Sequence, residues 1–219
     1  ISVITIIVII VFCTNFCWGL AESMGPGGCN VEKLHQRGLT GKNINVGLIS
    51  GAHPRRTHEA FGNPGRVFCY DFTGAGYDPN YHDTWVAGVV TSEGDSTHPD
   101  HIGVAPGSCV HSAAAVARYD IRDALEELVV NQNCRVMYSG IAFEAEGSED
   151  GNSFYSLIYD YYADKYNSFF ANPAGNSYSV NIFGDAYNGI TVGGLILENP
   201  NTEVPFTKVG SKSGSGYTE

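Results

Sequence analysis

Three short segments are rich in small residues that let the backbone approach other groups closely, and two of them also carry a polar side chain. His82 precedes Thr84 and the run 86–88 (Val-Ala-Gly), so its imidazole would lie at the start of a helix. The segment 102–107 precedes an apolar strand, and the segment 171–176 ends in a Gly turn and an Asn amide. An imidazole can transfer protons, and an amide can donate hydrogen bonds to a developing negative charge. Taken alone, a single His is more often structural than catalytic.

The elements that would position these segments alternate along the chain. Short apolar runs that read as strands cover residues 44–49, 66–70, 109–116, 135–138, 169–171 and 189–193. Residues 120–130 predict a helix that Asp120 can cap, and residues 153–166 predict another. One face of the first helix carries Ile121, Leu125, Leu128 and Val129. This alternation predicts an α/β fold, a mostly parallel sheet covered by helices, with its chemistry at the carboxyl ends of the strands.

Length and charge narrow the class of protein. The chain has 219 residues and 43% hydrophobic content, enough for one domain with a core of ordinary size. It carries 23 acidic and 12 basic side chains, a formal charge of -11. The dipeptide Arg55-Arg56 is its densest basic group, so a nucleic-acid-binding function is excluded.

The first residues have the character of an export signal. Residues 1–12 form an apolar run of signal-peptide length, and the small residues Gly19 and Ala21 suit cleavage after residue 21. Thr14-Asn15 interrupts the run before it is long enough for a stable membrane span. We therefore predict a signal peptide over residues 1–21 and a secreted mature protein. No basic residue precedes Lys33 and no initiator Met is present, so we expect the N-terminus to be incomplete.

The cysteines follow from the prediction of export. Of the six, those at 13 and 17 would leave with the signal, and Cys29, Cys69, Cys109 and Cys134 would remain. An even number in an exported protein favours two disulfides, and four buried free thiols are the alternative. The cysteine and histidine spacings match no zinc site, so we predict no metal centre.

Taken in order, these segments resemble the subtilisin-like serine peptidases, a family of secreted endopeptidases. The resemblance runs from about Leu34 to Gly210, and Gly103-Val-Ala-Pro106 is identical to a family motif. Two other matches are the first buried strand at 38–49 and the oxyanion-hole segment at 174–176. The last two are similar rather than identical: His-Asp-Thr-Trp-Val-Ala-Gly at 82–88 resembles the family's His-Gly-Thr-His-Val-Ala-Gly, and Phe-Thr-Lys-Val-Gly at 206–210 resembles its Phe-Ser-x-x-Gly strand. Five matches in the family's order are a specific signal.

The resemblance implies a subtilisin-like three-layer sandwich over residues 22–219, cut before the nucleophile helix, that acts on a peptide or protein substrate. It implies that His82 is the catalytic base and that Asn176 donates to the oxyanion. It also places the substrate backbone along Gly140, Ile141 and Ala142. No cofactor is implied. Calcium is frequent in the family, but the acidic run at 144–150 offers no spaced set of ligands, so no site is assigned.

The family's sheet also implies a disulfide pairing. Its second and third strands are neighbours, and here they hold Cys69 and Cys109. We therefore predict a bond between these two cysteines. Cys29 would then pair with Cys134.

The departures from the family bear on activity. Counting without a gap from Gly38 puts the family's catalytic Asp at Ser50, and a shift of one residue puts it at Ile49, so the carboxylate is missing. Asp83 replaces the Gly after the base and is the first candidate to substitute in part for the lost carboxylate, but side chains of adjacent residues rarely meet well. The family's nucleophilic Ser lies beyond Glu219, so we expect the segment itself to be inactive. We expect Ser50→Asp to raise the activity of the extended protein.

Two functions of different classes remain open. In the first, the parent is a secreted serine endopeptidase. In the second, it is a catalytically inactive pseudopeptidase that keeps the fold as a peptide-binding or interaction module, which the loss of the Asp at Ser50 favours. The sequence indicates no oligomeric state.

Overall fold

The computed structural model describes residues 23–25, 28–62, 64–141, 150–176, 180, 182–197, 206–210 and 213. The strands are β1 (Asn45–Ser50), β2 (Val67–Asp71), β3 (Cys109–Ala114), β4 (Val136–Ser139), β5 (Phe169–Pro173), β6 (Gly189–Val192), β7 (Leu195–Leu197) and β8 (Phe206–Val209). The helices are α2 (Glu32–His35), α3 (Tyr81–Thr91), α4 (Arg118–Leu125) and α5 (Phe154–Tyr166). Shorter helical segments are η2 (Glu59–Phe61), η3 (Pro64–Arg66), the π-helix η4 (Glu126–Asn131) and η5 (Ile182–Asp185).

Six strands form one parallel sheet in the order β2-β3-β1-β4-β5-β6. β1 lies inside it, with Leu48 paired to Ser112 of β3 and to Tyr138 of β4. β7 and β8 form a separate antiparallel pair. Because all the strands of the six-stranded sheet run the same way, their carboxyl ends meet at one edge, as the sequence predicts.

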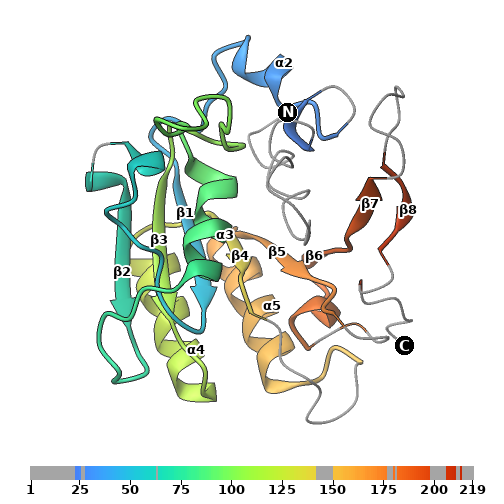
Figure 1. The fold of residues 1–219 in the computed structure, drawn as a ribbon. Coiled ribbons are helices and arrows are strands. Elements are labelled where there is room, and N and C mark those ends of the chain that lie inside the picture. Colours follow the sequence, from blue (N-terminus) through green and yellow to red (C-terminus); the bar gives the residue numbers. More distant parts are fainter. Residues whose placement is uncertain are drawn as a thin grey trace.

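Helices cover the two faces of the sheet (Figure 1). Side chains alternate along β1, so Leu48 packs in the core cluster beneath α3, and Ile49 packs in the cluster beneath α4 and α5. Both side chains are fully buried. The three-layer α/β sandwich predicted from the sequence is therefore confirmed.

The helix predicted over 120–130 starts earlier and changes its hydrogen-bond pattern. α4 begins after its N-cap residue Ala117, and the Asp120 carboxylate accepts the Ala117 N–H (3.0 Å) from inside the first turn. The prediction that Asp120 caps the helix is thus wrong by one turn, although the side chain still satisfies a free N–H. Beyond Leu125 the helix continues as the π-helix η4. The predicted apolar face is confirmed, since its four residues are fully buried.

The Gly-Val-Ala-Pro segment fixes the carboxyl end of α3. Gly103 N–H donates to Ser92 O (2.8 Å), and Ala105 N–H donates to Val90 O (2.7 Å). A Cβ on Gly103 would lie 2.7 Å from Val90 O, which real structures do not allow. Only glycine therefore permits this segment to lie against the last turn of the helix.

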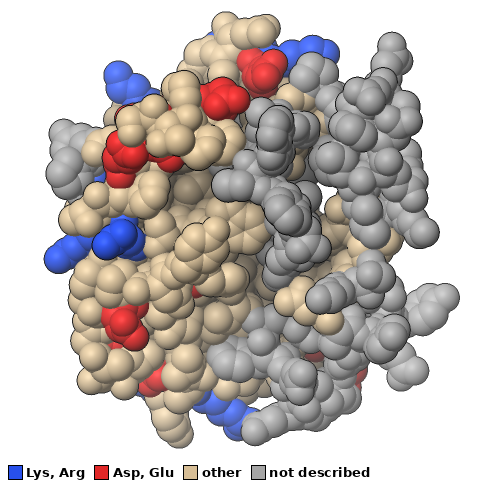
Figure 2. Space-filling model, viewed as in Figure 1, with Lys and Arg blue, Asp and Glu red and all other residues tan. Residues whose placement is uncertain are grey.

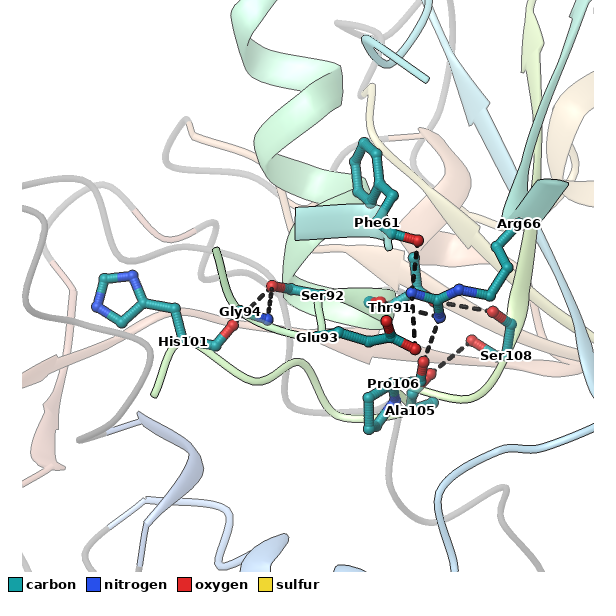
Figure 3. A network of polar contacts seen from close by, with 10 residues as sticks. All are labelled: Phe61, Arg66, Thr91, Ser92, Glu93, Gly94, His101, Ala105, Pro106 and Ser108. Carbon is teal, nitrogen blue, oxygen red and sulfur yellow. Dashed lines mark hydrogen bonds and ion pairs between the residues drawn. The ribbon is translucent and has the colours of Figure 1, made fainter. Parts of the chain in front are cut away.

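Arg66 ties α3 to the segments around it (Figure 3). Its guanidinium donates to Thr91 Oγ1 (3.0 Å), Phe61 O (2.6 Å) and Pro106 O, and it lies 3.1 Å from a Glu93 carboxylate oxygen. The Arg66 side chain is only 15% exposed. If it were removed, little water could reach these acceptors to replace its hydrogen bonds. One side chain thus joins η2, the end of α3 and the segment before β3.

The structure contradicts the predicted disulfides. The four cysteines in question are free thiols: Cys29, Cys69, Cys109 and Cys134. Cys69 pairs in register with Ser112, three residues beyond Cys109, which is an offset of about 10 Å along the strands and places the two side chains on opposite faces. A disulfide needs Cα atoms within about 7 Å of each other. Cys29 and Cys134 pack in different core clusters.

The charged residues lie apart on the surface. On the face drawn in Figure 2, Lys and Arg occur in small separate groups. Within the described residues, every helix is too short or too polar to span a bilayer.

We expect Arg66→Met to lower the free energy of unfolding by about 2 kcal/mol. The carbonyl oxygens that accept from the guanidinium would lose their charged donor, and they would remain largely shielded from water. The matched control is Arg122→Met, whose ion pair with Asp123 is half exposed on both sides and should contribute little. Urea denaturation of the two variants measures the difference. Equal midpoints would show that the Arg66 contacts do not stabilise the fold.

Candidate functional site

The candidate base lies in the first turn of α3. Asn80 caps this helix, because its side-chain oxygen accepts the Asp83 N–H (2.7 Å) and its carbonyl accepts the Thr84 hydroxyl (2.6 Å). The cap places His82 and Asp83 at the helix start, where the helix dipole favours a negative charge. The His82 side chain is 48% exposed and the Asp83 side chain 1% exposed, so the imidazole faces solvent above a buried carboxylate.

The buried carboxylate of Asp83 is the centre of the site. Its Oδ1 accepts the Ser50 hydroxyl (2.5 Å) and lies 2.9 Å from His82 Nδ1. Its Oδ2 accepts the Ala52 N–H (3.1 Å). Three donors therefore compensate the removal of this charge from water.

The contact between His82 and Asp83 corrects the expectation that these adjacent side chains would not meet. Hydrogen bonds from Ser50 and Ala52 hold the Asp83 carboxylate at the end of β1. The imidazole lies against Oδ1, the oxygen that also accepts the Ser50 hydroxyl. Residue adjacency is no obstacle, because both side chains reach one point from the first turn of a helix. His82 therefore has an orienting carboxylate, although none comes from position 50.

The contact also shifts the affinity of the imidazole for protons. The hydrogen bond to Asp83 raises the pKa of His82, burial opposes the increase, and the Asp83 charge adds to it. A carboxylate on Nδ1 keeps the proton there in the neutral ring and leaves Nε2 with its lone pair. The pair can therefore accept a proton at Nε2 and stabilise the imidazolium that forms.

Ser50 occupies the position expected for the family's Asp, and the space around it is small. It ends β1, is fully buried and donates to Asp83. A Cβ on Gly140 would lie 2.9 Å from Ser50 Oγ, so the neighbouring backbone closes over the hydroxyl. Ser50 is thus a donor that holds the carboxylate of another element.

The predicted substrate-binding residues follow β4. Gly140 N–H donates to Ile49 O (2.8 Å), so this group is already bonded within the sheet. Ile141 is half-buried at the same edge, and Ala142 lies outside the described residues. Strand addition at this place would have to use the groups beyond the Gly140 N–H, and it stays a prediction.

Asn176 follows β5 at the same edge of the sheet. Gly175 precedes it with φ 90°, and the Asn176 side chain is exposed. The register of Tyr138 with Ala171 places β5 beside β4, so Asn176 and Gly140 follow neighbouring strands. Its role as an oxyanion donor stays a prediction.

Sequence reasoning overlooked His53, a buried imidazole next to the site. Its side chain is 1% exposed, and its Nδ1 has no partner among the described residues. Its ring stacks on Tyr77 with centroids 5.5 Å apart, and burial lowers its pKa. Its carbonyl accepts the N–H of Asn80 (2.9 Å), so His53 holds the cap of α3. Only its position after β1 could have indicated it.

The described residues contain no cluster of His, Cys, Asp or Glu suited to a metal ion. Of the acidic run at 144–150, only Asp150 lies within them. A calcium site in that run therefore stays open.

The comparisons with known proteins identify the fold. No family model and no curated protein matches the chain. The solved structure of the prenylagaramide maturation protease PagA is similar, with TM-score 0.65 and 15% identity over 86% of this chain and 64% of that one. The PatG macrocyclase in complex with peptide gives 0.64 and 12% over 86% and 66%. The Clostridium perfringens CspB protease gives 0.57 and 19% over 71% and 40%.

These identities are too low to carry function, and the chain spans less than two thirds of the length of each of these structures. They agree, however, on the arrangement of the sheet and its helices. The chain therefore has the fold of subtilisin-like protease domains.

Proposed function

We propose that this chain is part of a serine endopeptidase in which His82 is the catalytic base and Asp83 orients it. The observation that carries the proposal is the Asp83 carboxylate, which meets both His82 Nδ1 and the Ser50 hydroxyl. In a serine peptidase triad, the carboxylate fixes the tautomer of the His and stabilises the imidazolium. Asp83 has the burial and the contacts for both tasks.

In the proposed reaction, Asp83 holds the proton on His82 Nδ1, so Nε2 removes a proton from the hydroxyl of the serine that the resemblance implies. That oxygen attacks the peptide carbonyl, and the imidazolium returns the proton to the leaving amine. Asn176 would donate to the negative oxygen of the tetrahedral intermediate. A peptide substrate agrees with the peptide bound to the PatG macrocyclase.

The alternative, a pseudopeptidase, drew its support from the missing carboxylate at position 50. Asp83 supplies a carboxylate to the His82 imidazole, and this contact favours the peptidase. The two proposals share the fold and differ in whether the full-length protein hydrolyses peptides. Secretion stays a prediction in both, because residues 1–21 lie outside the described residues.

We expect Asp83→Asn in the full-length protein to lower kcat by about four orders of magnitude, because an amide stabilises neither the correct tautomer nor the imidazolium. Asp123→Asn, which alters an exposed carboxylate on α4, is the matched control and should retain activity. Hydrolysis of a peptide library gives the measurement. Unchanged activity in Asp83→Asn would exclude Asp83 as the orienting group, and an inactive parent protein would favour the pseudopeptidase.

With Asp83 as the orienting group, the proposal leads to a different expectation for Ser50→Asp. The new carboxylate would lie against the Asp83 carboxylate, and two such charges in contact cannot both stay ionised. We expect the single variant to lose activity and the double variant Ser50→Asp/Asp83→Gly to recover it. The comparison is with Asp83→Gly alone, in the same peptide assay. If Ser50→Asp alone were more active than the parent protein, the assignment of Asp83 would fail.

A further inference from the structure

Two buried hydroxyl groups lie in one row of the sheet beneath α3. Ser112 and Tyr138 pair in register with Leu48 from its two sides, and Tyr138 packs with Leu48 and Ala87 of α3 in one core cluster. Ser112 is fully buried and Tyr138 is 2% exposed. Neither hydroxyl has a hydrogen-bond partner among the described residues. The row therefore contains two polar groups that contacts with the described part of the chain leave unsatisfied.

Asp83 lies over the same face of the sheet. It precedes Ala87 by one helical turn, so both face the strands, and its carboxylate reaches Ser50, two residues beyond Leu48 in β1. Burial raises the pKa of Tyr138, and the negative charge of Asp83 raises it further.

The carboxylate has room for one more donor. Two carboxylate oxygens offer about four acceptor positions, and Ser50, His82 and Ala52 occupy three of them. The remaining position is on Oδ2, which among the described residues accepts only the Ala52 N–H. On one face of the sheet, therefore, a carboxylate keeps a free acceptor position among the described residues, and a buried phenol lacks an acceptor.

Buried hydroxyl groups in native proteins are nearly always hydrogen-bonded, and buried water commonly bridges groups that cannot touch. We propose that the Tyr138 hydroxyl donates through buried water to the Asp83 carboxylate, which makes Tyr138 a positioning residue for His82. The Ser112 hydroxyl, in the same row, is a further polar group that can hold this water. A fourth donor spreads the negative charge of Asp83 and weakens its bond to the imidazole.

The inference rests on the proposed function for its chemical meaning, since it concerns the candidate base. Its test does not use peptide hydrolysis, so the failure of one is distinct from the failure of the other. The variant is Tyr138→Phe, which removes one oxygen and keeps the packing. The matched control is Tyr159→Phe, because the Tyr159 hydroxyl is equally buried but bonds directly to Ser139 (3.0 Å).

NMR titration of the His82 ring and urea denaturation provide the two measurements. We expect Tyr138→Phe to raise the pKa of His82 by a few tenths, because Asp83 loses a competing donor, and to lower the urea midpoint. Tyr159→Phe should lower the urea midpoint and leave the pKa of His82 unchanged. If the pKa of His82 is the same in Tyr138→Phe as in the parent protein, the proposal is overturned. A higher urea midpoint in Tyr138→Phe would likewise show that the hydroxyl has no partner.

Discussion

The candidate site depends on the buried carboxylate of Asp83 and the hydrogen bonds that it accepts. A negative charge with 1% exposure is unfavourable unless donors surround it. Ser50 and Ala52 come from β1 and the residues after it, and His82 comes from the same helix as Asp83. The requirement to satisfy one charge therefore joins the start of α3 to the end of the central strand and fixes the direction of the imidazole.

The opposite end of α3 is held by different means. The N–H groups of Gly103 and Ala105 bond to the carbonyls of its last turn, and Arg66 donates to the oxygen atoms of three residues around it. A helix fixed at both ends presents its first-turn side chains at one place relative to the sheet. Such rigidity is what a catalytic base requires, because proton transfer depends strongly on geometry.

The fold could be predicted from the sequence where the residue types within one segment determine its structure. Leu48 and Ile49 are adjacent and both apolar, so they predict a strand covered on both faces. Gly103 indicates a close approach of the backbone. The buried face of α4 follows from the spacing of its apolar residues. Each of these signals lies within one segment, so it can be interpreted without knowing which other segments that element contacts.

The errors concern contacts that depend on how elements are placed in the fold, which residue spacing does not encode. Whether Cys69 meets Cys109 depends on the register of two strands, and that register is offset by three residues. Whether Asp83 meets His82 depends on the direction in which Ser50 and Ala52 draw the carboxylate. Compared with the family pattern, the sequence lacks a carboxylate at position 50 and has an additional one at position 83. The contact between Ser50 and Asp83 is visible only in the fold.

The most direct test of the central claim is the pKa of the His82 imidazole in the parent protein and in Asp83→Asn, measured by NMR titration. The account predicts a pKa above the ordinary value of about 6.5 in the parent protein, because the buried carboxylate stabilises the protonated ring. In Asp83→Asn it predicts a value at or below the ordinary one, since the burial of the ring then acts alone. An identical pKa of His82 in the two proteins would contradict the account, because Asp83 would then have no effect on the protonation of the imidazole.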